Sequence, residues 1–172
     1  TGELNLNGRA LTAMNNVSVS GTLRMAGDST LKIDDASAAR TVTINGLLIA
    51  SGNATITATT AGCNADRTKS FAFNVGALPA TLDVSALKFS CAGAAGMNVA
   101  NAATFLNFNN VSFTLAPSGG RHLTLARSGG GDNTFTGVSF DASFSEGVGK
   151  VAQCTGDGAA VAFLDRLVVE RA

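Results

Sequence analysis

The chain contains no tryptophan and no tyrosine, and only one histidine. Tryptophan and tyrosine are the usual platforms on which sugar rings stack, because each joins a flat apolar face to a polar group. Any carbohydrate contact is therefore expected to be polar and shallow. A zinc site is not expected either, since the three cysteines show no C-x-x-C spacing. No cofactor of any kind is expected.

Charge is also scarce. Charged residues make up 14% of the 172 residues, against about 25% in a typical soluble domain, and 12 basic residues balance 12 acidic ones. No basic stripe occurs, so neither nucleic acid nor a polybasic membrane contact is expected. The apolar runs fall short of the roughly 20 residues that a membrane helix needs, so no membrane span is expected. Threonine, serine, asparagine and glycine take the place of charge, which is typical of secreted or cell-surface all-β proteins.

Helical periodicity is nearly absent, because glycine or asparagine interrupts almost every stretch. What remains is a series of short β-prone runs. The runs expected to form strands are Leu4–Leu6, Val17–Met25, Leu31–Ile33, Val42–Ile49, Thr55–Thr59, Phe71–Val75, Leu82–Phe89, Phe105–Leu115, His122–Ala126, Thr134–Phe144 and Val161–Val169.

Several of these runs share one repeated pattern, in which a polar or turn-like residue precedes an apolar-x-apolar box. The boxes begin at Val17, Leu47, Leu87, Val111, Val138 and Leu167. The later intervals, 24, 27 and 29 residues, each suit one coil of a β-solenoid. The longer interval of 40 residues between positions 47 and 87 leaves room for an extra strand, for which Phe71–Val75 is the candidate.

In such a coil, alternate side chains of each strand point into a narrow interior. We therefore expect Phe89, Phe113 and Phe140 to form one inward column, with Ser112 and Ser139 facing out. The six box-initial residues are expected to form a second column. Asparagines before several strands suit coil corners, where left-handed backbone is tolerated.

This pattern resembles the right-handed parallel β-helix, or pectate-lyase-like, superfamily of secreted polysaccharide enzymes, phage tailspikes and bacterial surface passengers. The resemblance implies an all-β parallel β-helix (β-solenoid) of about six coils. Residues 1–172 would form one domain, either complete or a piece of a longer repeat chain. The competing architecture is a β-sandwich or jelly roll, which also has many short strands separated by turns.

One acidic cluster invites a catalytic interpretation. Asp28, Asp34 and Asp35 flank the Leu31–Ile33 run, and Arg40 is nearby. Enzymes of the resembled superfamily use aspartates around calcium, or as an acid and base pair, together with a basic residue. The match is thin, because later coils offer Thr, Ala and Ser at the equivalent positions. A solvated turn is the alternative interpretation.

Two other features are weaker candidates. His122 is the single histidine, but no Gly-x-Ser-x-Gly motif accompanies it, so a coil-corner role is favoured over a catalytic triad. Asp132 lies in a glycine-rich segment similar to the calcium-binding nonapeptides of secreted toxins. Those motifs act in tandem, and a single copy indicates a loop.

The three cysteines leave their pairing open. Cys63 and Cys91 lie about one coil apart and are candidates for a disulfide in an oxidising compartment, which would leave Cys154 as a buried thiol. The alternative is that all three are small buried apolar residues.

These observations favour a non-enzymatic extracellular module, structural or adhesive, of a bacterial surface protein, fibre or filament. The expected partners are neighbouring repeats of the same chain or other copies of it, because a solenoid needs caps or neighbours at its terminal coils. A glycan or cell-surface ligand is a further candidate. The alternative functions are a polysaccharide lyase or hydrolase and a phage or fibre receptor-binding domain.

Overall fold

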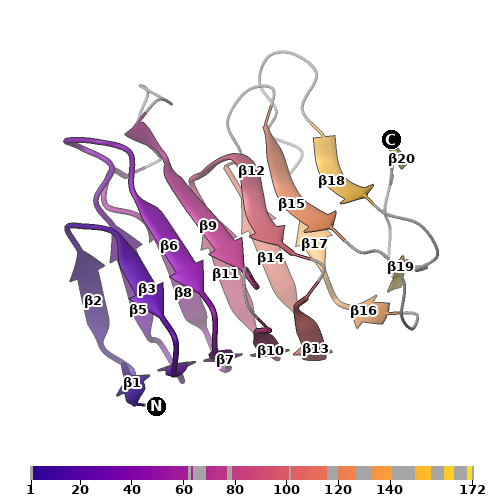
Figure 1. Ribbon diagram of the computed structural model, residues 1–172, viewed down its shortest axis with the longest axis horizontal. Helices are drawn as coiled ribbons and strands as arrows, with labels where there is room; N and C mark the ends of the chain where they lie inside the picture. Colours follow the sequence, from indigo (N-terminus) through magenta and orange to yellow (C-terminus); the bar gives the residue numbers. More distant parts are fainter. Residues whose placement is uncertain are drawn as a thin grey trace.

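The protein is described by a computed structural model covering residues 2–61, 63, 69–76, 79–100, 102–115, 120–126, 133–140, 150–155, 161–164 and 170–171. The described part of the chain is built from short β-strands (Figure 1). Their bounds are β1 Glu3–Asn5, β2 Ala10–Ala13, β3 Val17–Val19, β4 Thr22–Met25, β5 Thr30–Ile33, β6 Thr41–Ile44, β7 Leu47–Ala50, β8 Ala54–Ala58, β9 Phe71–Val75, β10 Thr81–Val84, β11 Leu87–Ser90, β12 Ala92–Val99, β13 Thr104–Phe108, β14 Val111–Thr114, β15 Arg121–Ala126, β16 Asn133–Thr136, β17 Ser139–Phe140, β18 Lys150–Thr155, β19 Val161–Leu164 and β20 Glu170–Arg171.

Nearly every strand pairs with the strands that lie three positions before and after it in the chain. Sheet A has the order β1-β4-β7-β10-β13, sheet B β17-β14-β11-β8-β5-β2 and sheet C β20-β18-β15-β12-β9-β6-β3, while β16 pairs with β19. Every ladder between described strands is parallel. Three successive strands thus form one coil, and successive coils follow one another from the indigo to the yellow end of Figure 1. This is the parallel, solenoid-like arrangement predicted above, whereas a sandwich or jelly roll would pair its strands antiparallel.

Alternation of apolar and polar residues explains why these short strands form. In β4, β7 and β10 the second and fourth residues are buried and the other two are partly exposed. Leu23, Leu48 and Leu82 stand in register on these strands and are almost completely buried. Each apolar side chain is therefore covered by the like residue of the next coil.

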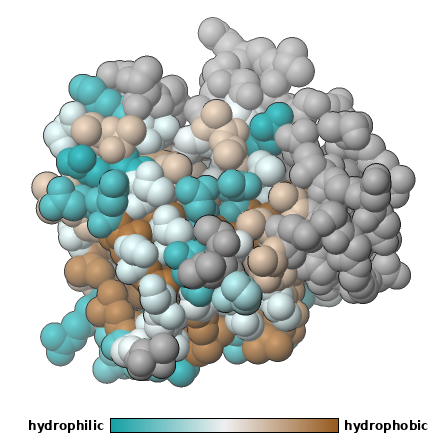
Figure 2. Space-filling model, viewed as in Figure 1, coloured by the Kyte–Doolittle hydropathy of each residue, from teal (hydrophilic) through white to brown (hydrophobic). Residues whose placement is uncertain are grey.

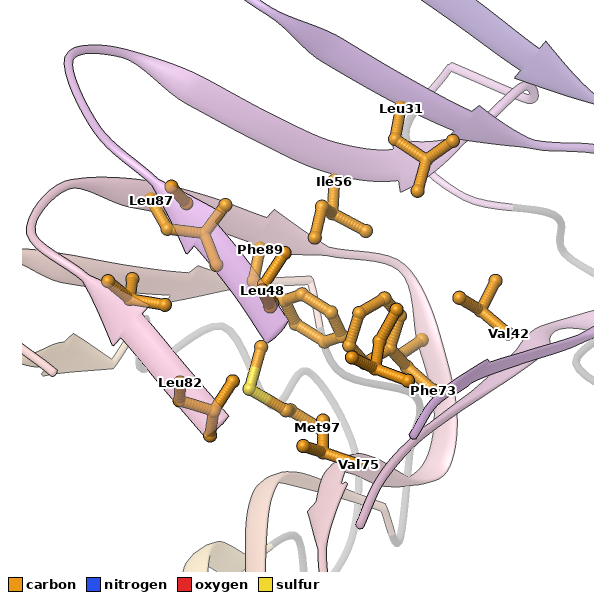
Figure 3. Close-up of a cluster of buried hydrophobic side chains, with 14 of the residues drawn as sticks. Leu31, Val42, Leu48, Ile56, Phe73, Val75, Leu82, Leu87, Phe89 and Met97 are labelled. Atoms are coloured by element: carbon orange, nitrogen blue, oxygen red, sulfur yellow. The ribbon is translucent and has the colours of Figure 1, made fainter. Parts of the chain in front are cut away.

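The three sheets enclose one apolar interior. Figure 3 shows Leu48 and Leu82 of sheet A turned toward the same interior as Phe89 of sheet B and Met97 of sheet C, and all four are buried. The core is consequently continuous along the stack of coils, which is the property that stabilises solenoids.

The predicted phenylalanine column is confirmed. Phe89 pairs in register with Phe113, and Phe113 with Phe140. The ring centroids are 5.6 Å apart in the first pair and 5.1 Å apart in the second, where the rings are stacked. Such separations are favourable for aromatic pairs.

The second predicted column is wrong in its first members. Val17 lies on sheet C opposite Val42, Leu47 lies on sheet A, and only Leu87 and Val111 face each other on sheet B. Val138 is buried just before β17, and position 167 lies outside the described residues. The apolar-x-apolar box occurs on all three sheets, because each of them contributes one wall to the same interior.

Coil corners contain the asparagines and glycines that tight turns need. Asn7 and Asn110 adopt positive φ angles of 46° and 53°, as expected for asparagine at such corners. A β-carbon added at Gly46 would collide with the backbone carbonyl oxygen of Gly21 in the preceding coil. Glycine is therefore required where these two corners stack.

A disulfide joins Cys63 to Cys91, the pairing that the sequence left open. Cys63 lies between β8 and β9, and Cys91 lies between β11 and β12 in the next coil. The bond therefore ties together the corners of two successive coils. Cys154 lies in β18, and its side chain is outside the described part of the structure.

Candidate functional site

Asp34 organises the turn that leads from β5 into β6. Its Oδ1 accepts a hydrogen bond from the backbone N–H of Ala36 at 3.1 Å. Its Oδ2 accepts one from the Ser37 hydroxyl at 2.7 Å and one from Nη2 of Arg40 at 3.3 Å. Nη2 of Arg40 also donates to the Ser37 hydroxyl at 3.0 Å. The carboxylate thus acts as the acceptor that closes the turn, as aspartates do in local side-chain turns.

Asp35 instead connects two coils. Its Oδ1 accepts hydrogen bonds from the Thr59 hydroxyl at 3.0 Å, the Thr60 backbone N–H at 2.9 Å and the Thr60 hydroxyl at 2.8 Å. These donors follow β8, which lies beside β5 in sheet B. The Asp35 side chain is buried, so these bonds compensate for its removal from water.

Hydrogen bonds hold the pKa of both carboxyl groups below the ordinary value of 3.8. For Asp34 the main cause is the bond from the Ser37 hydroxyl, followed by the bond from the Ala36 N–H. For Asp35, burial is the largest single influence and acts to raise the pKa, but the combined bonds from Thr60 and Thr59 outweigh it. Both groups are therefore ionised at neutral pH, and neither is poised to act as a general acid.

The structure does not gather the predicted catalytic residues on one open face. Asp28 is exposed before β5, where its Oδ1 accepts a hydrogen bond from Nδ2 of Asn53 at 3.2 Å. Asp34 and Asp35 follow the other end of β5, which is about 13 Å long. Arg40 pairs with Asp34, at the opposite end of β5 from Asp28. Asp28 is therefore separated by the length of β5 from the other two aspartates, and the structure uses Asp34 and Asp35 as hydrogen-bond acceptors within and between coils.

His122 lies near the start of β15, where the chain has passed from sheet B to sheet C. It is the second residue of β15 and is buried, with its ring centroid 6.1 Å from that of Phe113 and 5.9 Å from that of Phe140. The His122 ring therefore packs beside the phenylalanine column of sheet B. Asp132 lies outside the described residues.

The outward face of sheet C is uncharged over much of its length. Ser18, Thr43, Asn74, Asn98 and Thr124 stand in register along it. Nδ2 of Asn98 donates to Oδ1 of Asn74 at 3.1 Å. Figure 2, which views this face, shows white and teal side chains over it. A ligand would meet hydroxyl and amide groups here, and no aromatic platform.

The first coil has an incompletely covered interior. Leu4 on β1 is 43% exposed, whereas Leu23 and Leu48 in the same column are 1% and 0% exposed. The strands β1, β2 and β3 each stand at the edge of their sheet. Sequence reasoning did not single out Leu4, because exposure of an inward residue depends on which coil it occupies and not on its local pattern.

No group of three or more His, Cys, Asp or Glu side chains is placed to hold a metal ion in the described part of the chain. Among the same residues, no helix is long and apolar enough to cross a membrane.

The fold and these contacts define a protein of the parallel β-solenoid class. Comparison of the chain with protein-family models, curated proteins and solved structures gives no match.

Proposed function

We propose that this chain is a non-enzymatic structural or adhesive module of a bacterial extracellular surface protein, fibre or filament. In this proposal it is a right-handed parallel β-helix of about six coils, of the pectate-lyase-like type. Strand order supports the coil number, since β1 to β15 form five consecutive triplets across sheets A, B and C, and β17 and β18 continue sheets B and C into a further coil. The strong preference for right-handed crossovers between parallel strands supports the handedness.

The observation that carries the proposal is the open first coil. Leu4, Leu11 and Val17 occupy inward columns on β1, β2 and β3, and all three are more exposed than their partners in the next coil. The three edge strands also present backbone groups that pair on one side only. A further parallel β-coil would cover this apolar surface and extend all three sheets at once.

The partner we infer is another β-coil of the same kind, from a neighbouring repeat or from a second copy of the chain. A glycan or cell-surface ligand remains a further candidate, with the uncharged face of sheet C as its contact. The balanced charge of 12 basic and 12 acidic residues argues against a nucleic-acid partner.

The two buried aspartates support a structural role, and the disulfide supports a location outside the cytosol. Asp34 and Asp35 serve as acceptors for turn and inter-coil hydrogen bonds, so their chemistry is used for stability. The disulfide between Cys63 and Cys91 is of the kind that persists in oxidising compartments.

The test is the association state of the purified chain and of two matched variants. Leu4→Lys places a charge in the open coil, whereas Leu106→Lys places one on the 64% exposed Leu106 of β13, at the opposite end of sheet A from β1. We expect the parent and Leu106→Lys to form end-to-end oligomers or filaments visible by electron microscopy and light scattering. Leu4→Lys should remain monomeric, because a lysine would be buried at the joint without a partner.

A parent chain that stays monomeric at the highest soluble concentration, or a Leu4→Lys variant that associates as well as the parent, would contradict the proposed end-to-end contact. A discrete trimer unaffected by Leu4→Lys would instead favour a phage or fibre receptor-binding domain.

A further inference from the structure

The strand β12 contains a large bulge beside sheet B. Ala92 pairs with Phe71 and Met97 pairs with Phe73, so five steps along β12 span only two along β9. The extra residues loop outward and return at Gly96, whose φ is +62°. A β-carbon at Gly96 would collide with the carbonyl group of His122, so the bulge closes tightly onto β15. Bulges of this kind often shape functional sites.

A cavity of about 10 Å³ lies between this bulge and the neighbouring coil. Its lining includes Cys91 of the disulfide, Arg121 and His122 of β15, and Ser90 and Thr114 of sheet B. Among the described residues, no aspartate or glutamate lines it. A space of this size accommodates one water molecule or one monatomic ion, and it is too small for an organic ligand.

Arg121 provides the unusual chemistry of this cavity. Its Nε is buried and has no hydrogen-bond partner. A buried donor without an acceptor is costly, and a guanidinium stays charged at every accessible pH. Arg121 thus brings a buried, unpaired cationic donor to a cavity that has no carboxylate among its described lining residues.

We propose that this cavity binds a monatomic anion of the chloride class, held by the Nε–H of Arg121. A water molecule would also satisfy the donor, but only an anion would offset the positive charge of the Arg121 guanidinium. The ion would tie β12 to β15 at the corner that the Cys63–Cys91 disulfide already joins to the preceding coil. This inference concerns the inside of one chain and stands independently of the proposed end-to-end contact.

Bromide is the direct probe, because its anomalous scattering identifies it in a crystal. Crystals of the full chain grown in sodium bromide should show an anomalous peak within hydrogen-bond distance of Nε of Arg121. In solution, replacing sodium gluconate with sodium chloride or bromide at constant ionic strength should raise the melting temperature saturably. The expected rise is about 3–6 °C at about ten times the dissociation constant, because the ion binds the folded state only. Gluconate is too large for the cavity.

The matched variants are Arg121→Leu, which removes the donor, and Arg24→Leu, which removes an exposed arginine paired with Glu3 on sheet A. Arg24→Leu should keep the halide-dependent rise and Arg121→Leu should lose it. The proposal fails if the wild-type crystals show only water at Nε, or if the rise is absent or equal in both variants. Because the crystal experiment uses the wild-type chain, it decides the matter even if Arg121→Leu does not fold.

Discussion

At the scale of single residues, the two buried aspartates show how an acidic pair can serve structure. Asp34 closes its own turn through Ala36, Ser37 and Arg40, and Asp35 accepts donors from the next coil. Carboxylates suit both tasks, because each oxygen accepts more than one hydrogen bond and charge-assisted bonds are stronger than neutral ones. The consecutive pair therefore fixes both the shape of one corner and its position relative to the next.

Replacing Asp35 should reveal its inter-coil role. Asp35→Ala removes the acceptor for three donors of Thr59 and Thr60, and we expect the free energy of unfolding to fall by about 2–3 kcal/mol. Asp35→Asn keeps one oxygen acceptor and should lose less. Denaturant titration measures both, with Asp28→Ala as the exposed control, expected within about 0.5 kcal/mol of wild type. Equal losses for Asp35→Ala and Asp28→Ala would contradict the assigned role.

The same carboxylates should make the fold sensitive to acid. Their pKa values in the folded chain lie below the ordinary 3.8, so the unfolded chain binds more protons in this range. The stability that they contribute is complete above 3.8 and is lost as the pH falls from 3.8 through the folded pKa values. Denaturant titrations across this interval should show a smaller acid loss for the Asp34→Asn, Asp35→Asn double variant than for wild type. Parallel curves for the two proteins would refute this origin of acid sensitivity.

The sequence allowed the residues of the site to be predicted, but not all of the contacts between them. Aspartates at 34 and 35 and the arginine at 40 were recognisable from proximity in the chain, and Arg40 does contact Asp34. The donors to Asp35 were not recognisable, because Thr60 lies 25 residues away and meets Asp35 only through the stacking of coils. Whether a polar cluster is catalytic or structural depends on such contacts between coils.

At the scale of elements, the disulfide limits how far two coils can separate. It closes a segment with a sequence separation of 28 residues between Cys63 and Cys91. Restricting a loop of that length in the unfolded chain corresponds to about 3–4 kcal/mol in the chain-entropy model. The stability of the corner between sheets B and C is therefore expected to fall when this disulfide is reduced.

Removing this bond gives the first prediction at this scale. The Cys63→Ser, Cys91→Ser double variant should unfold with a free energy lower by about 2–4 kcal/mol. Reductant should lower the stability of the wild-type chain by a similar amount and leave the double variant unchanged. If reductant affects both proteins equally, the stabilisation does not come from the bond between Cys63 and Cys91.

The second prediction at this scale concerns the corners at which glycines of successive coils stack. Gly46→Ala should destabilise the fold by about 1–3 kcal/mol, because the new β-carbon meets the Gly21 carbonyl oxygen of the preceding coil. Gly2 precedes the first coil at the corresponding corner, where the Thr22 N–H donates to the Gly2 carbonyl oxygen. No atom lies within 4 Å of a β-carbon added there, so Gly2→Ala is the matched control and should have little effect. Thermal unfolding compares the two, and a similar loss in both would show that stacking is not the cause.

Most strands could be predicted because burial of one face imposes an alternating pattern on each. The points at which one apolar run divides into two strands could not be predicted. The single predicted run Val17–Met25 is two strands, β3 and β4, on different sheets, separated at Ser20 and Gly21. The strand β12 was missed because alanine and glycine dominate its bulge and hide the alternation. The second predicted column was wrong because the same apolar-x-apolar box occurs on all three sheets. The box alone does not indicate to which sheet a strand belongs.

At the scale of the whole molecule, the main contacts between described strands join successive coils, so stability is expected to vary along the stack. The largest sets of contacts join a strand to its neighbour three positions along the chain, as in β12 with β15 and β5 with β8. A terminal coil is stabilised from one side and an internal coil from both. Local opening should therefore be easiest at the first coil.

Amide hydrogen exchange measures this gradient and connects it with the proposed assembly. At low concentration the amides of β1, β2 and β3 should exchange faster than those of β7 and β8, because the first coil opens without disrupting the rest. If a further coil docks on this edge, raising the protein concentration should slow exchange in β1 to β3 and leave β7 and β8 unchanged. The Leu4→Lys variant should show the gradient at every concentration, since its edge cannot dock. Uniform exchange along the coils would show that the chain opens as one cooperative unit, and a concentration effect that persists in Leu4→Lys would place the contact elsewhere.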